Sequence, residues 1–336
     1  MQFLNNNLSN KHSFMKHSIL FLKVLLPLCF LSLNSISQER YKDEITDSAR
    51  IETYTYAFKD GKSLDMDVYF PEFDNQSQRP LIFYVHGGGF SGGVRNDPGI
   101  QTFCKKLARH GYVVSSISYR LTREGKESGF GCDCPAVDKR NTFNDAVEDL
   151  QDATFFMIKN RDKMGIDPQK IIISGSSAGA ETVLNTAYQP PYCYGLDSGP
   201  VSYAGVISMA GAIPDTSRIF NESAIPSLLF HGTCDNLVPY ASAPHHYCKK
   251  SEPGYLILHG SYTIAEKLKK LGTPYWLYTY CNASHEIASK PMWDNFNEII
   301  DFCYSYIVNK GTEQKTTIMK TDNKTCEYQS FNFCTE

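Results

Sequence analysis

The sequence predicts an α/β fold in which helices flank both faces of a doubly wound, mostly parallel sheet. Two observations favour this fold. Short, continuously apolar runs of strand length recur along the chain, and helical segments separate them. The chain has 336 residues, and the part left when both ends are set aside, about 260 residues, suits one α/β domain. We therefore expect a single α/β domain over residues 48–310.

Residues 1–37 have the features of a secretory signal peptide. Lys16 precedes the apolar run Ile19–Leu31, and the small residues Ser35 and Ser37 are placed as at a cleavage site. A lysine and a proline interrupt the run, which leaves it short of the roughly 18 apolar residues of a membrane span. We expect a cleaved signal and a secreted or periplasmic protein, with no stable membrane span; a membrane anchor is the alternative.

The first strands are predicted as a hairpin. Ile51–Phe58 and Leu64–Phe70 alternate apolar and polar residues on either side of the turn-forming pair Asp60-Gly61. The next two strands, Leu81–Val85 and Val113–Tyr119, are continuous apolar runs, as expected of strands covered on both faces. A helix near Gln101–His110 separates them, which predicts a parallel pair.

The same alternation continues to residue 308. A long amphipathic helix is predicted over Asn144–Met164 and a buried strand over Lys170–Ser174. The remaining predicted elements are the helix Ala178–Ala187, the strands Tyr203–Met209, Pro226–Phe230 and Tyr275–Tyr280, and the helices Tyr262–Leu271 and Trp293–Val308.

Four segments do not follow this alternation. Thr122–Asn141, Gln189–Ser202 and Tyr240–Ser261 are rich in Gly, Pro, Ser or Cys, and we expect them to be loops that shape a substrate pocket. The tail Gly311–Glu336 is polar and shows neither a helical nor a strand period. We expect it to be a C-terminal appendage of unknown role.

Net charge and cysteine content limit the classes of function that we expect of the chain. The formal charge is −3, and it becomes −6 without the three N-terminal lysines, so nucleic-acid binding has no basic patch to rest on. Removal of Cys29 leaves ten cysteines, which suits disulfides in an oxidising compartment. Cys132 with Cys134 and Cys326 with Cys334 are local candidate pairs. A metal site is the weaker interpretation, because no second Cys/His pair follows at zinc-site spacing.

The strongest chemical signal is the pentapeptide Gly175–Gly179, with Ser177 at its centre. Such a Gly-x-Ser-x-Gly motif arises by chance in about one chain in ten of this length. Here it follows a buried strand and leads into a helix, the setting of a nucleophile elbow. We therefore expect Ser177 to be a nucleophile, and the neighbouring glycines to let strand and helix approach closely.

A second motif, His86-Gly87-Gly88-Gly89-Phe90, comes directly after the strand Leu81–Val85. Its glycines allow the backbone to approach a developing oxyanion. We expect the N–H groups of Gly88 and Gly89, with that of Ala178, to form an oxyanion hole. A flexible glycine turn is the alternative.

A serine hydroxyl needs a base and an orienting acid, which follow the nucleophile in the order acid, then histidine. Asp235 comes after the strand Pro226–Phe230, and His285 comes after the strand Tyr275–Tyr280. We expect His285 to be the general base and Asp235 to orient it. Glu286 is the alternative acid.

The other histidines of the chain fit these roles less well. His231 is predicted to be packed and hydrogen-bonded, and His86 to brace the glycine loop. His245 and His246 lie in a long loop without metal-type partners.

Together these motifs resemble the hormone-sensitive-lipase-like carboxylesterases and the exported acetyl and feruloyl esterases, over roughly Ile51 to Lys310. The resemblance implies the α/β-hydrolase fold and hydrolysis of short acyl or aryl esters, small or polysaccharide-linked, without metal or cofactor. The Thr122–Asn141 loop and the tail have no counterpart in that resemblance. A serine exopeptidase and a non-catalytic binding module with the same fold remain alternatives.

Overall fold

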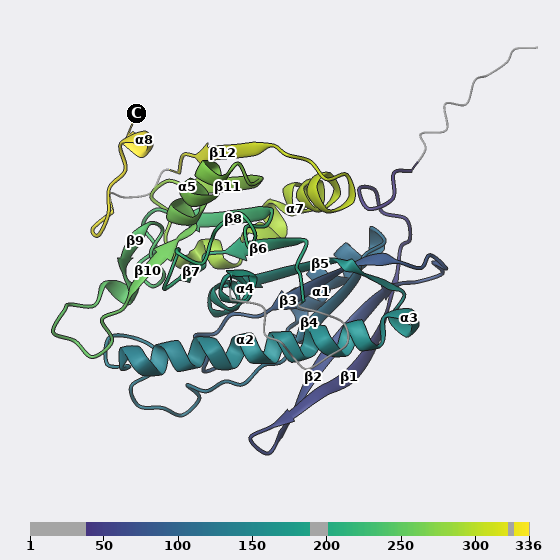
Figure 1. Ribbon diagram of the computed structural model, residues 1–336, viewed down its shortest axis with the longest axis horizontal. Coiled ribbons are helices and arrows are strands. Elements are labelled where there is room, and N and C mark those ends of the chain that lie inside the picture. Colours follow the sequence, from purple (N-terminus) through teal and green to yellow (C-terminus); the bar gives the residue numbers. More distant parts are fainter. Residues whose placement is uncertain (1–37, 189–200, 322–325, 336) are drawn as a thin grey trace, which may run out of the picture. The chain divides into compact units, whose positions relative to one another are not determined.

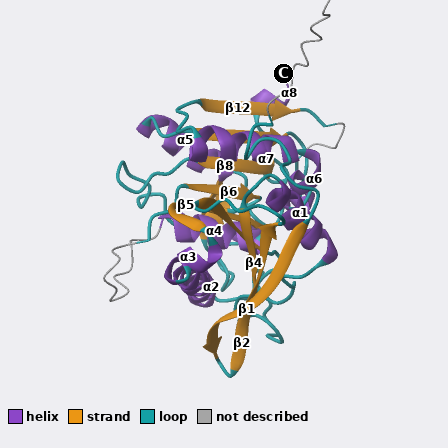
Figure 2. Cartoon of the chain, turned by 90° about the vertical axis from the view of Figure 1, so that its right-hand side faces the viewer, coloured by secondary structure: helices purple, strands orange, loops and turns teal. Residues whose placement is uncertain are grey.

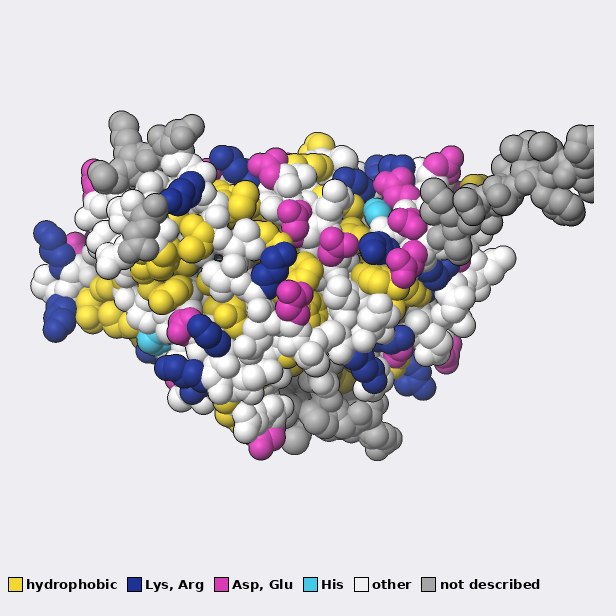
Figure 3. All heavy atoms as spheres, turned by 90° about the horizontal axis from the view of Figure 1, so that it is seen from above, with side chains coloured by type: hydrophobic (Ala, Val, Ile, Leu, Met, Phe, Trp, Pro, Cys, Tyr) yellow, Lys and Arg dark blue, Asp and Glu magenta, His cyan; other side chains and the backbone are white. Residues whose placement is uncertain are grey.

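The computed structural model describes residues 38–188, 201–321 and 326–335, which belong to one compact unit, Gln38–Glu336. The expected signal segment, residues 1–37, and most of the expected loop Gln189–Ser202 lie outside the described residues. Within the described ranges, no helix has the length and apolar character needed to cross a membrane. Figure 3 shows basic and acidic side chains interspersed over one face of the protein.

A nine-stranded sheet forms the centre of the unit, in the order β1-β2-β4-β3-β5-β6-β8-β11-β12 (Figure 1). The pairs from β4 to β12 are parallel, and only β1–β2 and β2–β4 are antiparallel. The prediction of a mostly parallel sheet is confirmed. The strands are β1 (Ala49–Lys59), β2 (Lys62–Pro71), β3 (Arg79–Val85), β4 (Val113–Ile117), β5 (Ile166–Ser176), β6 (Gly205–Met209), β8 (Ser227–Gly232), β11 (Tyr275–Tyr280) and β12 (Gln314–Met319).

Helices cover both faces of this sheet (Figure 2). One apolar core joins β3 and β5 to α2 and α4, and a second joins the opposite face to α1 and α7. Strands covered on both sides need apolar side chains at every position, which explains the continuous runs of β3 and β6. The helices are α1 (Pro98–Arg109), α2 (Ala136–Lys159), α3 (Arg161–Met164), α4 (Ala178–Tyr188), α5 (Ser261–Leu271), α6 (Pro291–Asp294), α7 (Phe296–Phe302) and α8 (Asn332–Thr335).

The predicted hairpin is confirmed at β1 and β2. Asp60 has φ of 51° and Gly61 has φ of 76°, so both central turn residues are left-handed, as a two-residue turn between twisted strands requires. The hairpin forms the edge of the sheet farthest from β12.

The predicted loop Thr122–Asn141 was wrong in its last six residues, because α2 begins at Ala136, eight residues before the predicted start. The stretch rich in glycine and cysteine ends before the helix, at Pro135. A contact with a distant segment of the chain then stabilises the first turn of α2. Lys139 is fully buried and donates a hydrogen bond to the carbonyl oxygen of Gly254 at 2.9 Å. At its other end the predicted helix is divided at Asn160 into α2 and α3.

The predicted helix Trp293–Val308 is likewise divided, at Asn295, into α6 and α7, and a π-helical turn, Cys303–Val308, follows. The predicted loop Tyr240–Ser261 contains two short strands, β9 (Ser242–Pro244) and β10 (Ile257–Gly260). They pair with each other, and β10 also pairs with β7 (Ala212–Ile213). Strands of three or four residues are too short to show a period in the sequence.

The tail, which shows no strand period in its sequence, contributes a strand to the sheet. Gln314–Met319 forms β12, which pairs in parallel with β11 along its whole length. Five of its six residues are exposed, because an edge strand buries neither face fully. Its polar sequence therefore shows no apolar alternation, although its backbone completes the sheet.

The disulfides join distant segments rather than the predicted local pairs. Three bonds form among the described residues, Cys132–Cys248, Cys234–Cys326 and Cys281–Cys334. The local pairs Cys132/Cys134 and Cys326/Cys334 were therefore wrong. Sequence spacing carries no information on which loops the fold brings together. Among the described residues, Cys104, Cys134 and Cys303 are free and buried.

Candidate active site

Ser177 lies at a sharp turn between β5 and α4. Its φ is 51°, a strained value for a residue with a side chain and one that occurs at nucleophile elbows. A Cβ atom on Gly175 would lie 2.4 Å from the backbone of Gly179, and one on Gly179 would lie 2.0 Å from the carbonyl oxygen of Val85. Only glycine fits either position, which explains the two glycines of the motif.

The structure brings together the three residues expected to form a triad. Ser177 Oγ lies 2.8 Å from His285 Nε2, and His285 Nδ1 lies 2.7 Å from Asp235 Oδ2. Asp235 follows β8 and His285 follows β11, so both loops leave the carboxyl edge of the sheet beside Ser177. The backbone N–H of Cys234 donates to the carbonyl oxygen of Ala283 at 2.8 Å, which holds the two loops against each other.

Asp235 is fully buried and is held as a carboxylate. Burial alone would raise its pKa, but hydrogen bonds from His231 and His285 outweigh burial and lower the pKa. Its Oδ1 accepts the backbone N–H groups of Leu237 and Val238, both at 2.9 Å. The carboxylate is therefore positioned to orient His285 and to stabilise a positive charge on it.

The alternative acid, Glu286, does not contact the imidazole of His285. It is exposed, and its carboxylate accepts the backbone N–H of Ser284 at 3.0 Å. His231 is packed as predicted and also lies 3.3 Å from Asp235 Oδ2. Asp235 is therefore the carboxylate of this constellation, with His231 as its second imidazole neighbour.

The predicted oxyanion residues line the same cavity as Ser177. Gly88 has φ of 125° and Gly89 has φ of 60°, and a Cβ on Gly88 would lie 2.2 Å from the carbonyl oxygen of Gly92. Their loop is braced from below, because Tyr119 donates a hydrogen bond to the carbonyl oxygen of His86 at 2.8 Å. Gly88, Gly89 and Ala178 thus line one cavity together with Ser177, and their role as an oxyanion hole stays a prediction.

The cavity has a volume of about 530 Å³, within the range of small-molecule sites. It is lined by Gly88, Gly89, Ser91, Phe130, Gly131, Ser177, Ala178, Glu181, Leu237, Val238, His245, His246, His285, Ala288 and Ser289. Sequence reasoning missed Glu181, His245 and His246 as lining residues. The signal for Glu181 was its place one helical turn after Ser177, on the same helix face.

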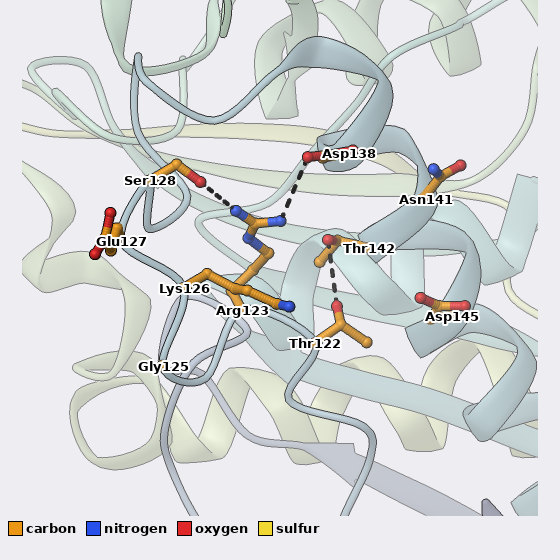
Figure 4. Close-up of a pocket in the computed structure, with 10 residues that line it drawn as sticks. All are labelled: Thr122, Arg123, Gly125, Lys126, Glu127, Ser128, Asp138, Asn141, Thr142 and Asp145. Carbon is orange, nitrogen blue, oxygen red and sulfur yellow. Dashed lines mark hydrogen bonds and ion pairs between the residues drawn. The ribbon is translucent and has the colours of Figure 1, made fainter. Parts of the chain in front are cut away.

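A second cavity of about 610 Å³ lies on the other side of the loop that carries Phe130. Figure 4 shows Arg123 within it, between Ser128 and Asp138. Arg123 donates to Ser128 Oγ at 2.6 Å and to the carbonyl oxygen of Gly129 at 2.7 Å. These bonds fix the loop whose next residues form a wall of the Ser177 cavity.

In the described part of the chain, one cluster has the spacing of metal ligands, formed by Cys132, Cys248 and Glu252. Its two sulfur atoms are bonded to each other, which removes both thiolates as ligands.

Comparison with solved structures identifies the fold. An esterase from Thermogutta terrifontis, solved with propionate bound, superposes with a TM-score of 0.54 and 21% identity, over 78% of this chain and 95% of that chain. The same esterase phosphorylated by paraoxon gives a TM-score of 0.54 over 82% of this chain. The chain therefore has the α/β-hydrolase fold. As the sequence resemblance implied, residues 66–191 match the BD-FAE family.

Curated relatives match part of the α/β-hydrolase. Gut esterase 1 of Caenorhabditis elegans is 27% identical over 45% of this chain and 25% of its own length. Phenmedipham hydrolase of Pseudarthrobacter oxydans is 33% identical over 39% of this chain and 24% of its own length. Arylacetamide deacetylase of Oryctolagus cuniculus is 30% identical over 36% of this chain. The chain spans about a quarter of the length of these relatives.

Proposed function

We propose that this α/β-hydrolase is a serine carboxylesterase that acts through an acyl-enzyme. The observation that carries the proposal is the continuous series of short contacts from Ser177 Oγ through His285 to the buried carboxylate of Asp235, at the floor of a cavity. The names of the relatives, which include an esterase, a hydrolase and a deacetylase, support it.

In the proposed mechanism, His285 Nε2 accepts the hydroxyl proton of Ser177 while Oγ attacks the ester carbonyl carbon. The N–H groups of Gly88, Gly89 and Ala178 donate to the oxyanion that forms. His285 then gives its proton to the departing alcohol, which leaves an ester on Ser177. Water attacks this ester with His285 again as base, and release of the acid restores the free serine.

For the substrate, we propose short-chain or aryl esters, including acetyl or feruloyl groups carried on polysaccharides. The BD-FAE family, whose name denotes bifunctional acetyl and feruloyl esterases, supports this class. The cavity volume of about 530 Å³ leaves room for a small acyl or aryl group.

We also propose that the protein is exported after removal of residues 1–37. Three disulfides in the folded unit suit an oxidising compartment. N-terminal sequencing of the protein from the medium or periplasm of its host tests this proposal, and an intact N-terminus on a cell-associated chain would contradict it.

The nucleophile is tested with paraoxon, whose diethyl phosphoryl group transfers to an activated serine with loss of p-nitrophenolate. Intact-mass analysis should show one added diethyl phosphoryl group on the wild-type chain and none on Ser177→Ala. Modification of Ser177→Ala to the same extent would overturn the assignment.

The reaction class is tested with a substrate panel. Short and long p-nitrophenyl esters, aminoacyl-p-nitroanilides, and acetylated and feruloylated xylan distinguish an esterase from an exopeptidase. Turnover of the anilides alone would indicate the exopeptidase. A folded protein that turns over none of these compounds would be a binding module.

A further inference from the structure

A second carboxyl–imidazole pair lies in the Ser177 cavity, and the mechanism proposed above does not use it. Glu181 and His245 both line the cavity, and their side chains are 2% and 1% exposed. Glu181 Oε1 lies 3.7 Å from His245 Nε2, which is too far for a hydrogen bond.

Glu181 is fixed relative to the nucleophile. It lies in the first turn of α4, and its backbone N–H donates to the carbonyl oxygen of Ser177 at 2.9 Å. Residues four apart on a helix lie on one face. The backbone of Glu181 is therefore held at a fixed position relative to Ser177.

His245 is held by the loop on the opposite side. Its backbone N–H donates to the carbonyl oxygen of Leu256 at 2.8 Å, and its ring packs against Phe130 at a centroid distance of 5.2 Å. His246 and Tyr247 follow with φ of 55° and 52°. Strained backbone of this kind persists where the surrounding structure enforces it, and it is common at ligand sites.

Each member of the pair has an unpartnered polar atom. Within the described part of the chain, Glu181 Oε1 and His245 Nδ1 are buried without a hydrogen-bond partner. A buried polar group without a hydrogen-bond partner destabilises the protein relative to one that is paired. These atoms therefore favour any ligand that enters the cavity and forms hydrogen bonds with them.

Burial favours the neutral form of both groups. Burial raises the pKa of Glu181 well above its usual value, although Lys139 opposes the shift, and burial lowers the pKa of His245 well below its usual value. A neutral carboxyl group and a neutral imidazole can each donate and accept one hydrogen bond. The pair therefore suits a partner that is itself both donor and acceptor.

We propose that Glu181 and His245 bind a hydroxyl group of the substrate ester and so select hydroxylated esters over their unhydroxylated analogues. The proposal rests on the esterase function proposed above and assigns part of its specificity. An alkyl group at this position would leave both polar atoms unpaired. Lys139 lies close enough to affect the pKa of Glu181, and its positive charge disfavours a cationic ligand.

The hydroxyl group can belong to the acyl part or to the alcohol part of the ester, and two substrate pairs distinguish these sources. Methyl 4-hydroxycinnamate and methyl cinnamate differ by one hydroxyl on the acyl side. Glyceryl monoacetate and propyl acetate differ by hydroxyls on the alcohol side. Measured with the full chain, kcat/KM should favour the hydroxylated member of one pair by about tenfold to a hundredfold.

Substitution of either residue should abolish this preference. In Glu181→Leu and in His245→Phe, we expect the ratio of kcat/KM within the selected pair to fall to within about twofold of one. Glu181→Gln keeps the shape and the hydrogen-bonding groups, so it should retain most of the ratio and serves if the leucine variant does not fold. Glu127→Gln, the same change at an exposed residue outside this cavity, should leave both activity and ratio unchanged.

Two results would overturn the proposal. One is a wild-type ratio near one for both pairs, and the other is a ratio that survives in Glu181→Leu and His245→Phe. Failure of the underlying esterase function has a different signature, because then no member of either pair would be hydrolysed.

Discussion

Two carboxyl–imidazole pairs, each with a buried carboxyl group, lie at or next to the Ser177 cavity, and they differ in several physical respects. Asp235 and His285 lie 2.7 Å apart, whereas Glu181 and His245 lie 3.7 Å apart. The pKa of Asp235 is lowered, and that of Glu181 is raised. Two carboxyl groups that are both buried therefore have pKa values shifted in opposite directions, which favours the ionised form of Asp235 and the neutral form of Glu181.

The difference lies in the number of donors around each carboxyl group. Asp235 accepts two backbone N–H groups and faces two imidazoles, which together outweigh the cost of burying its charge. Glu181 has an oxygen with no partner in the described structure. Burial alone does not set the state of a carboxyl group; its donors decide whether it can orient a base or remains free to bind a ligand.

The largest expected effect comes from removing the negative charge of Asp235 in its pair with His285. Asp235→Asn should lower kcat by about 10⁴-fold, because the amide no longer stabilises a protonated His285 or fixes its tautomer. The measurement is kcat for a short-chain p-nitrophenyl ester, with circular dichroism to check folding. Glu286→Gln is the control and should retain nearly full activity; the reverse result would give the acid role to Glu286.

The next-largest effect tests whether a different disulfide stabilises the loops of each pair. Cys132–Cys248 ties the loop of His245 to the loop of Phe130, and its replacement by two serines should lower the free energy of unfolding by about 2–5 kcal/mol. We expect KM to rise while kcat changes little, because the triad loops keep their own disulfides. Removing Cys281–Cys334, which lies in the loop before His285, is the matched comparison and should lower kcat instead. Equal kinetic effects of both changes would contradict this separation.

A smaller effect is expected from removing one hydrogen-bond donor of Asp235, which makes its surroundings more like those of Glu181. His231→Leu removes one imidazole from Asp235, so the pKa of that carboxyl group should rise. The free energy of unfolding should fall by about 1.5–3 kcal/mol, the contribution of a hydrogen bond to a charged group. Urea unfolding measures the change, and His231→Gln, which keeps a donor, should lose less. Equal losses in the two variants would show that packing rather than hydrogen bonding accounts for the effect.

The smallest expected effect is on the pH dependence of stability. Burial, aided by Lys139, lowers the pKa of His246 to about 4, whereas an unfolded histidine titrates near 6.5. Between these values the unfolded chain binds a proton that the folded chain does not, so stability is lost as the pH falls. At pH 5.5 the loss should be about 1 kcal/mol. His246→Asn should show a shallower decline of the melting temperature between pH 7 and pH 4.5, and an unchanged slope would contradict the assignment.

The sequence predicted the first pair but not the second, for a physical reason. Ser177, Asp235 and His285 each follow their own strand of a parallel sheet, and the carboxyl ends of such strands meet at one edge. Glu181 and His245 meet because a loop folds back over α4, and no period in the sequence records such a contact. The early start of α2 and the exposed strand β12 escaped prediction similarly, because a tertiary anchor and backbone pairing stabilise them.

The tail has a consequence for the order in which the site is completed during synthesis. Chains fold from the N-terminus as they are made, so the elbow of Ser177 can form well before residue 326 is available. Cys234, next to Asp235, and Cys281, near His285, find their partners only in Cys326 and Cys334. A nascent chain therefore carries its nucleophile before its acid and base loops are covalently secured. A chain cut at residue 310 would keep that unfinished condition, with two unpaired thiols beside the triad.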